Sequence, residues 1–417
     1  MRQTRVWARL LGVQGTIVED VAVEEDEVGA LATLVVAVRL RTTDAGRCGI
    51  CRRRSPRYDR GEGRRRWRHL DLGTVQSCIE AEAPRIRCRD HGVVVGWVPW
   101  ARHGAGHTRA FDDTAAWLAV RTAKTAVVQL LRISWRTVGR IITRVSAEKT
   151  ANVDRFAGLS RIGIDEISYK RGHRYLTVVV DHDRGRLIWA AVGRDEATLR
   201  SFFKALGEQR CAAITLVSAD AATWIANVVA ERCPKATLCM DPFHVCQWAS
   251  RALDDVRREV WNAARRGGQH AVARELKGAR FALWKNPEHL TERQETKLAL
   301  IAKTNQPLYR AYLLKEQLRQ VFHVRGRRGM RLLDRWLAWA QRCRLPAFVK
   351  VGRSIREYRA SIDAALIHEL SNARVESINT RLRLLTRIAF GFRSAEALIG
   401  LAMLSLGGYC PSLPDRA

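Results

Sequence analysis

Three acidic residues stand where their charge needs an explanation. Asp165 interrupts the apolar stretch RIGIDEIS, Asp220 ends the stretch ITLVSAD, and Glu376 lies in the amphipathic stretch SNARVESINTRLRLL. If the two aspartates come from neighbouring strands, their like charges are tolerable only when cations neutralise them. Two Mg²⁺ or Mn²⁺ ions held by such carboxylates would suit phosphodiester cleavage. Any one of these acids taken alone is better explained as a strand-end residue that caps a helix.

The helical spacing around Glu376 adds polar groups to the same face. Five side chains follow the pattern i, i+4, i+7, i+11 and i+15: Asn372, Glu376, Asn379, Arg383 and Arg387. Residues so spaced share one face of an α-helix. We therefore expect a carboxylate, two amides and two guanidiniums to point together, with Asn379 auxiliary to the metal site.

A second polar pair follows a short apolar stretch. Asp241 and His244 lie in CMDPFHV, directly after the last expected strand. They are either auxiliary to the same metal site or a cap on the helix that begins there.

Four potential zinc ligands come in two pairs of matching spacing. Cys48 and Cys51 form one pair, and Cys88 and His91 form the other. Two ligands separated by two residues can share one tetrahedral Zn²⁺, and two pairs on hairpins make a ribbon. The alternative is buried thiols beside an unrelated surface histidine. The segment between the pairs is rich in arginine and also carries Tyr58 and Trp67, so it suits DNA phosphates, unless it is only a solvated loop.

The residues from Thr108 to Glu148 have the pattern of a helix-turn-helix. Two apolar helical stretches end at a short turn, Arg132–Ser134, and a third stretch follows. The apolar stripe comprises Val127, Leu130, Leu131, Val138, Ile141, Ile142 and Val145. Away from it point Arg136, Thr137, Arg140 and Arg144, which we expect to enter the major groove of DNA. Helical hairpins of this kind are also common as packing elements.

The remaining pattern predicts the elements that position these groups. Alternating stretches at Gly15–Val23 and Leu31–Leu40 predict a hairpin, and Ser77–Ala83 predicts a further strand. From Arg161 three strands are followed by helix, strand, helix and strand, which indicates a mixed five-stranded α/β sheet. Beyond Val245 the pattern is almost wholly helical to about Gly408.

The charge of the chain favours a polyanionic partner. Among 417 residues, 72 Lys and Arg oppose 42 Asp and Glu, for a formal net charge of +30. Small-molecule enzymes have no need of such an excess, so nucleic acid is the expected partner. Arginine from a GC-rich genome is the alternative explanation. The sequence shows neither a spanning apolar run nor a signal peptide, and ten cysteines in such a chain are not expected to form disulfides.

The motifs in their order resemble one known family. The zinc knuckle, the helix-turn-helix, IGIDEISYKRGHRYLTVVVDHDRGRLI, CMDPFHV with its helix, and SNARVESIN followed by GFRS resemble the ISL-three family of insertion-sequence transposases over nearly the whole chain. One departure is His91, where many members have cysteine.

The resemblance implies a DDE-type transposase on an RNase H-like fold. It implies a β-rich zinc module over 1–106, a helix-turn-helix domain over 107–150, and a catalytic domain over 158–410 with a helical insertion at about 246–365. Asp165 and Asp220 would bridge two metal ions and Glu376 would complete the second ion's ligands. Arg383 and Arg387 would contact phosphates.

The implied reaction is cleavage of double-stranded DNA at the terminal inverted repeats, followed by joining of the 3′ hydroxyls to target DNA. We expect a homodimer or larger assembly on DNA in the bacterial cytoplasm, associated with the nucleoid. The alternatives are a metal-dependent nuclease or resolvase that does not join, and a domesticated DNA-binding protein. Intact carboxylates disfavour the last.

Overall fold

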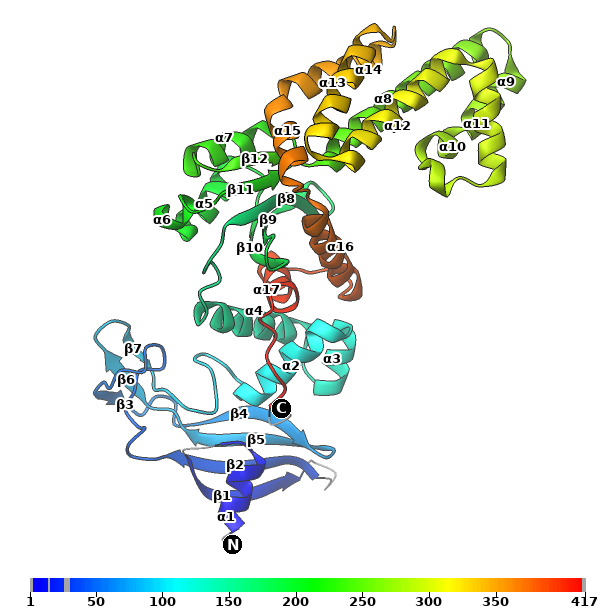
Figure 1. The fold of residues 1–417 in the computed structure, drawn as a ribbon. Helices are drawn as coiled ribbons and strands as arrows, with labels where there is room; N and C mark the ends of the chain where they lie inside the picture. Colours follow the sequence, from blue (N-terminus) through cyan, green and yellow to red (C-terminus); the bar gives the residue numbers. More distant parts are fainter. Residues whose placement is uncertain (1–2, 14–15, 26–30, 415–417) are drawn as a thin grey trace. The chain divides into compact units, whose positions relative to one another are not determined.

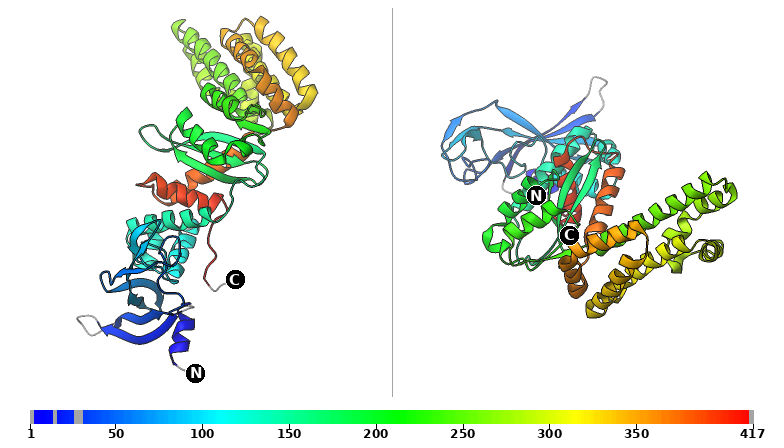
Figure 2. Two further views of the ribbon diagram at one scale, coloured as in Figure 1. Left: turned by 90° about the vertical axis from the view of Figure 1, so that its left-hand side faces the viewer. Right: turned by 90° about the horizontal axis from the view of Figure 1, so that it is seen from above.

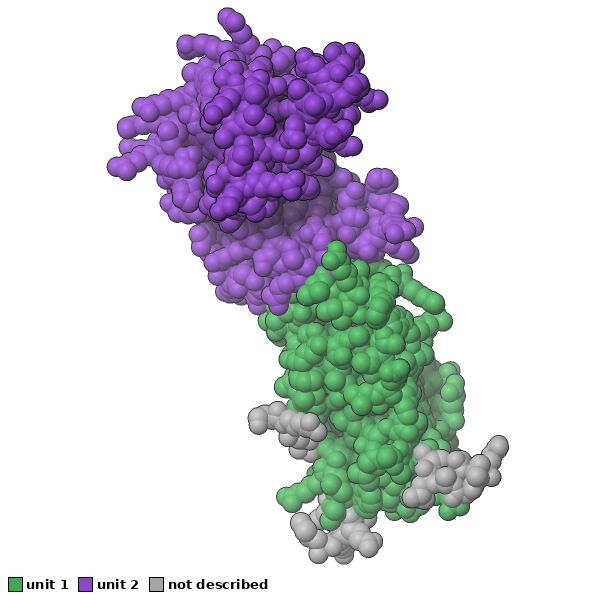
Figure 3. All heavy atoms as spheres, turned by 90° about the vertical axis from the view of Figure 1, so that its right-hand side faces the viewer, with its two compact units in different colours: residues 1–154, 384–417 green, residues 155–383 purple. Residues whose placement is uncertain are grey.

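The computed structural model forms two compact units, coloured separately in Figure 3. It describes residues 3–13, 16–25 and 31–414. Unit 1 comprises residues 1–154 and 384–417, and unit 2 comprises residues 155–383.

The last segment of the chain groups with unit 1. It begins at residue 384 and so includes the end of the catalytic domain expected over residues 158–410. Helix α17 (Ala395–Leu406) is almost wholly apolar and packs on α4 (Trp135–Ala151). A Cβ placed on Gly400 would lie 3.3 Å from Ile142, so the absence of a side chain at Gly400 permits this close approach.

The N-terminal part of unit 1 is mostly β-structure (Figure 1). After α1 (Gln3–Leu10), four strands form a sheet in the order β1-β2-β5-β4. The strands are β1 (Thr16–Glu25), β2 (Leu31–Leu40), β4 (Arg64–Leu72) and β5 (Val75–Glu82). The expected first hairpin and the strand near Ser77 are confirmed, although Gly15 lies outside the described residues. A second, smaller sheet comprises β3 (Arg57–Asp59), β6 (Arg85–Cys88) and β7 (Gly92–Val95).

Three helices follow as the pattern indicates: α2 (Arg109–Arg121), α3 (Lys124–Leu131) and α4. Arg132 adopts a left-handed conformation (φ 53°) and ends α3, and the Ser134 hydroxyl caps α4 by accepting from the amide of Thr137 at 3.1 Å. The expected apolar stripe is buried except at Leu130. That side chain is 64% exposed because it lies on the outer face of the short α3.

Unit 2 contains the predicted mixed sheet, in the order β10-β9-β8-β11-β12. Its strands are β8 (Arg161–Lys170), β9 (Arg174–Asp181), β10 (Arg186–Val192), β11 (Leu216–Ala219) and β12 (Thr237–Met240). The first three form an antiparallel meander, and β8, β11 and β12 are parallel. The first and fourth strands, β8 and β11, are therefore neighbours, as expected from the sequence.

One face of this sheet is covered by α5 (Glu196–Leu206) and α7 (Thr223–Arg232), with the short α6 (Glu208–Cys211) between them. Ile162 and Ile164 of β8 point into this core with Phe202 and Val228. Because side chains alternate along a strand, Gly163 and Asp165 point to the opposite face. The Asp165 carboxylate therefore points away from the apolar core that Ile162 and Ile164 of the same strand enter.

The chain after β12 is helical through α16, the helix that carries Glu376, as the views in Figure 2 show. They are α8 (Pro242–Arg266), α9 (His270–Gly278), α10 (Arg280–Trp284), η1 (Pro287–His289), α11 (Glu292–Thr304), α12 (Gln306–Val324), α13 (Gly326–Arg342), α14 (Pro346–Glu357), α15 (Arg359–His368) and α16 (Ala373–Ile388). Most share one apolar core around the fully buried Trp336, whose indole donates to the carbonyl of Leu314 at 2.8 Å.

Candidate active site

The ends of two parallel strands bring two aspartates to one edge of the sheet. Asp220 directly follows β11, and Asp241 directly follows β12. The last residues of these strands, Ala219 and Met240, are paired in register, and the amide of Asp241 donates to the carbonyl of Ala219 at 3.0 Å. Both carboxylates therefore emerge at the same level of the same edge.

Asp165 reaches this edge from the middle of β8. Its strand runs parallel to β11 and continues beyond the point where β11 ends. Burial, together with the negative charge of Asp220, raises the pKa of Asp165 to about 7. The two aspartates are thus close enough to repel each other, which is the situation that the sequence predicted.

His244 binds both strand-end aspartates. Its Nδ1 lies 2.9 Å from an oxygen of Asp220 and 3.0 Å from an oxygen of Asp241. Burial opposes the charged imidazole, but the hydrogen bonds to Asp220 and Asp241 raise the pKa of His244 to about 10. The side-chain donor atoms of these three residues all lie within 4.8 Å of one another.

Helix α16 brings Glu376 and its flanking amides to this edge. The Asn379 side-chain amide donates to Asp165 at 2.6 Å, and the backbone amide of Asn372 donates to Asp241 at 3.1 Å. Glu376 lies between them on the same face. Burial and the negative charge of Asp241 raise the pKa of Glu376, which places its carboxyl within the field of the same cluster.

Gly163 explains why α16 can lie so close to the sheet. A Cβ at this position would come within 2.3 Å of Val375 and 2.7 Å of His182 Nε2. The same region holds a buried series of hydrogen bonds, which begins with His182 Nε2 at 2.7 Å from the Ser218 hydroxyl. That hydroxyl donates to the side-chain oxygen of Asn372, so the start of α16 is tied to β11.

The donor set fits hard divalent cations. Asp165, Asp220, Asp241 and Glu376 supply carboxylate oxygens, which Mg²⁺ and Mn²⁺ prefer. Burial and, after it, the negative charges of neighbouring aspartates raise the pKa values of Asp165 and Glu376. The side-chain oxygen of Asn379 is also buried without a hydrogen-bond partner in the described part of the chain. The residues therefore suit a cation that would relieve both defects.

One acidic neighbour was missed by sequence reasoning. Glu166 adjoins Asp165 and binds Arg194 at 2.5 Å, and burial raises its pKa. Its second carboxylate oxygen is buried without a hydrogen-bond partner among the described residues. The dipeptide Asp-Glu within an apolar strand was the available signal. Of the two expected phosphate-binding arginines, Arg383 is exposed in unit 2, and Arg387 is exposed in unit 1.

The four predicted zinc ligands converge in unit 1. Cys51 Sγ and Cys88 Sγ are 3.7 Å apart, and His91 Nδ1 lies 3.7 Å from Cys48 Sγ and 3.5 Å from Cys88 Sγ. A tetrahedron with Zn–S of about 2.3 Å and Zn–N of about 2.0 Å has S–S edges of about 3.8 Å and S–N edges of about 3.5 Å. The hydrogen bond with His91 lowers the pKa of Cys88 to about 6, which favours the thiolate that a metal binds.

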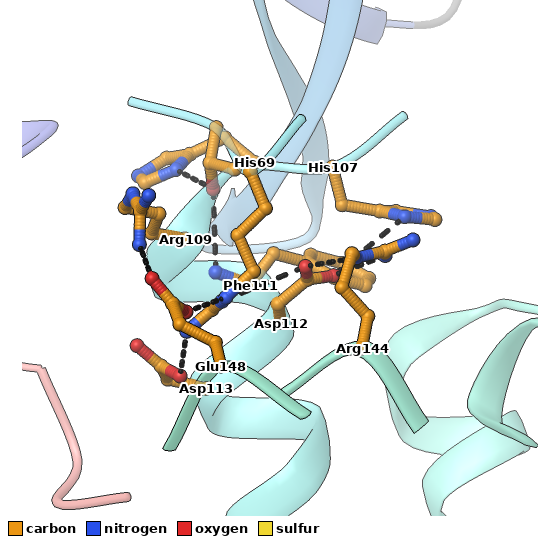
Figure 4. A network of polar contacts seen from close by, with 10 residues as sticks. His69, His107, Arg109, Phe111, Asp112, Asp113, Arg144 and Glu148 are labelled. Carbon is orange, nitrogen blue, oxygen red and sulfur yellow. Dashed lines mark hydrogen bonds and ion pairs between the residues drawn. The ribbon is translucent and has the colours of Figure 1, made fainter. Parts of the chain in front are cut away.

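The helix-turn-helix presents only part of the expected polar face. Arg136 and Arg140 of α4 are exposed, whereas Thr137 is half-buried and its hydroxyl contacts Ser134 at 2.9 Å. Arg144 differs from the expectation: its Nε and Nη2 each donate to the fully buried Asp112 at 3.0 Å, as Figure 4 shows. A buried carboxylate needs such a partner. Arg144 therefore joins α2 to α4 instead of pointing toward a ligand.

Comparison with known proteins matches three family models in the expected order. A zinc-finger of transposase IS204/IS1001/IS1096/IS1165 matches residues 44–91, and the helix-turn-helix domain of transposase family ISL3 matches residues 98–146. A transposase model of the same family, of the DDE type, matches residues 162–401. This chain belongs to the ISL3 family of transposases.

Individual relatives agree with this assignment. The transposase is 59% identical to the transposase for insertion sequence element IS1557 from two strains of Mycobacterium tuberculosis, over all of this chain and 98% of the relative. It is 27% identical to the transposase for insertion sequence element IS1001 from Bordetella parapertussis, over 65% of this chain and 66% of that one. No helix in the described part of the transposase is long and apolar enough to cross a membrane.

Proposed function

We propose that this transposase cleaves DNA at the ends of its insertion sequence and joins the 3′ hydroxyls to target DNA. The proposal includes an RNase H-like catalytic domain in which α8–α15 are inserted before Glu376. The convergence of Asp165, Asp220 and Glu376 at one edge of the sheet supports it most strongly.

Asp165, Asp220 and Glu376 are the residues that would hold two Mg²⁺ or Mn²⁺ ions, with Asp241 as a further carboxylate. Bound metal would make a water or 3′ hydroxyl a better nucleophile and stabilise the leaving oxygen. Asn379 orients Asp165 through its 2.6 Å hydrogen bond. His244 holds Asp220 and Asp241 together as a cationic partner.

The N-terminal modules would recognise the terminal inverted repeats. Arg136 and Arg140, exposed on α4, would read base edges in the major groove, and Thr137 would lie beside them. One Zn²⁺ on Cys48, Cys51, Cys88 and His91 would organise the ribbon. Arg383 and Arg387 would contact phosphates. Because two ends must be brought together, we propose a homodimer or larger assembly on DNA.

A strand-transfer assay tests the catalytic proposal. The wild-type protein, a labelled duplex ending in the element's terminal repeat and Mg²⁺ should yield both nicked ends and joined products. Cleavage without joined product would instead favour a nuclease or resolvase, and the absence of both reactions would favour a DNA-binding protein.

A second experiment tests recognition. Arg136→Ala with Arg140→Ala should erase the preference for terminal-repeat DNA over random DNA, because a good bidentate base contact contributes about 1–3 kcal/mol. Exposed Arg328, on α13 of unit 2, supplies the matched control. Arg328→Ala should keep the preference; unchanged preference in the double variant would refute the assignment.

A further inference from the structure

A pocket of about 260 Å³ opens beside the carboxylate edge, within unit 2. Its walls come from the start of α8, the end of α12, and the connection from α15 to α16. Phe243, Phe322, Leu366 and Leu370 supply an apolar lining, whereas Asp241 and Glu376 line the same pocket from the catalytic side. One cavity thus joins an apolar chamber directly to two of the acidic groups.

Phe243 is the most unusual part of this lining. It is 54% exposed although it lies in the first turn of α8, one residue before His244. The Phe243 ring meets the His244 ring edge-on, with centroids 5.8 Å apart. A single exposed aromatic ring is ordinary on a protein surface. Here the ring adjoins both a pocket and the acidic cluster, so it offers a flat stacking face where the substrate must lie.

We propose that this pocket receives one unstacked nucleobase of the substrate DNA, from a nucleotide next to the scissile phosphate, with Phe243 as its stacking partner. The inference rests on the proposed function. With a phosphate at the carboxylates, the flat and largely apolar group within one nucleotide's reach is the base. Drug-sized ligands fill about 300–1,000 Å³, so a smaller volume suits a single base.

The rim of the pocket supports this occupant. Arg325 and Glu369 form an exposed ion pair at 3.0 Å, and both residues line the pocket together with Ser371. These polar groups offer donors and acceptors to the edge of a base. Extruding a base from the duplex costs unstacking and unpairing energy, which stacking on an aromatic ring offsets.

The test is a cycle between Phe243→Ala and abasic DNA. Duplexes carrying the terminal repeat are made with a single abasic nucleotide at each position flanking the cleavage site in turn. On intact DNA, Phe243→Ala should slow cleavage by about 5- to 150-fold, the scale of one lost base–aromatic stack. On DNA that is abasic at one particular position, wild type and variant should cleave at equal rates, because no base remains to stack.

Two variants serve as controls for this cycle. Phe243→Trp retains a stacking face and should restore cleavage of intact DNA. Phe281→Ala removes a 63% exposed phenylalanine on α10 and should change no rate. The proposal is overturned if Phe243→Ala cleaves intact DNA like wild type, or if its defect persists on every abasic duplex. A loss of self-association in Phe243→Ala without DNA would assign the pocket to a second copy and also overturn it. Failure of the wild type to cleave any duplex would instead contradict the proposed function.

Discussion

The zinc-ligand cluster and the carboxylate cluster differ in how much apolar core surrounds them. The ribbon around Cys48, Cys51, Cys88 and His91 has almost no core, and its buried apolar contacts are the cysteines with Ile86 and Val94. The carboxylates at the edge of the unit 2 sheet stand beside an extensive apolar core that runs through β8, α5 and α7. The first site therefore has little apolar core to support it without an ion, whereas the second stands on a core that already supports its repulsive charges.

This difference indicates whether the metal ion organises the fold or the fold organises the metal site. In the ribbon, each ligand pair is local in sequence, and two-residue spacing brings the atoms together at the knuckle. Metal binding there contributes directly to folding. In unit 2 the acids come from separate elements, and their raised pKa values reflect a cost that the rest of the fold offsets. We therefore expect metal removal to unfold the first site and only inactivate the second.

The largest expected effect is loss of zinc from the ribbon. Cys51→Ser, or a strong chelator, should unfold the turn at residues 48–51 and the small sheet of β3, β6 and β7 while the unit 2 sheet stays folded, because structural zinc sites contribute about 10 kcal/mol or more of apparent binding free energy. Hydrogen exchange resolved by segment measures both regions in one experiment. Elemental analysis should find one zinc per chain. Unchanged hydrogen-exchange protection of the ribbon after complete zinc removal would contradict this prediction.

The next effect is loss of catalysis without loss of fold. Asp165→Asn, Asp220→Asn and Glu376→Gln should each reduce cleavage and joining on the order of 10⁴-fold, as expected for members of one catalytic unit. The melting temperatures of Asp165→Asn and Glu376→Gln should equal or exceed that of wild type, because each of these two changes removes a repelling charge. The triple variant should be no less active than the single ones. Asp183, an exposed acid in the turn between β9 and β10 that pairs with Arg161, supplies the control, and Asp183→Asn should retain activity.

Full activity in Glu376→Gln would move the third catalytic carboxylate elsewhere. Asp241 is then the first residue to test, because it lies with Asp220 and His244 and the pocket beside it is shared with Glu376.

The smallest effect concerns the docking of α16. Gly163→Ala places a methyl group within 2.3 Å of Val375, so it should destabilise unit 2 by about 1–3 kcal/mol through overpacking. Because α16 carries Glu376, cleavage should fall more than stability does. Val375→Ala in the same chain should recover part of the activity by making room. Equal losses in Gly163→Ala with and without Val375→Ala would assign the effect to His182, which the same methyl group would approach to 2.7 Å, and not to the docking of α16.

Sequence reasoning reached Asp165 and Asp220 because strand adjacency follows from a meander followed by parallel strands. It reached the face shared by Asn372, Glu376 and Asn379 because helical periodicity is local. The predicted DNA contact of Arg144 was wrong. A helical pattern separates apolar from polar faces, but it does not reveal that Asp112 of α2 is buried opposite Arg144. The expected burial of Leu130 was wrong for a related reason. The apolar pattern does not reveal which side of the short α3 stays exposed.

The sequence by itself determined the local devices of this transposase: the two zinc-ligand pairs, the helix-turn-helix, and the order of strands that makes β8 and β11 neighbours. Each depends on spacing over a few residues or on the alternation of elements. Only the tertiary structure decided that His244 lies between Asp220 and Asp241, and that Gly163 admits α16 beside the sheet. It also grouped residues 384–417 with unit 1. These features depend on packing between segments far apart in the chain, where side-chain volume and burial decide what can lie together.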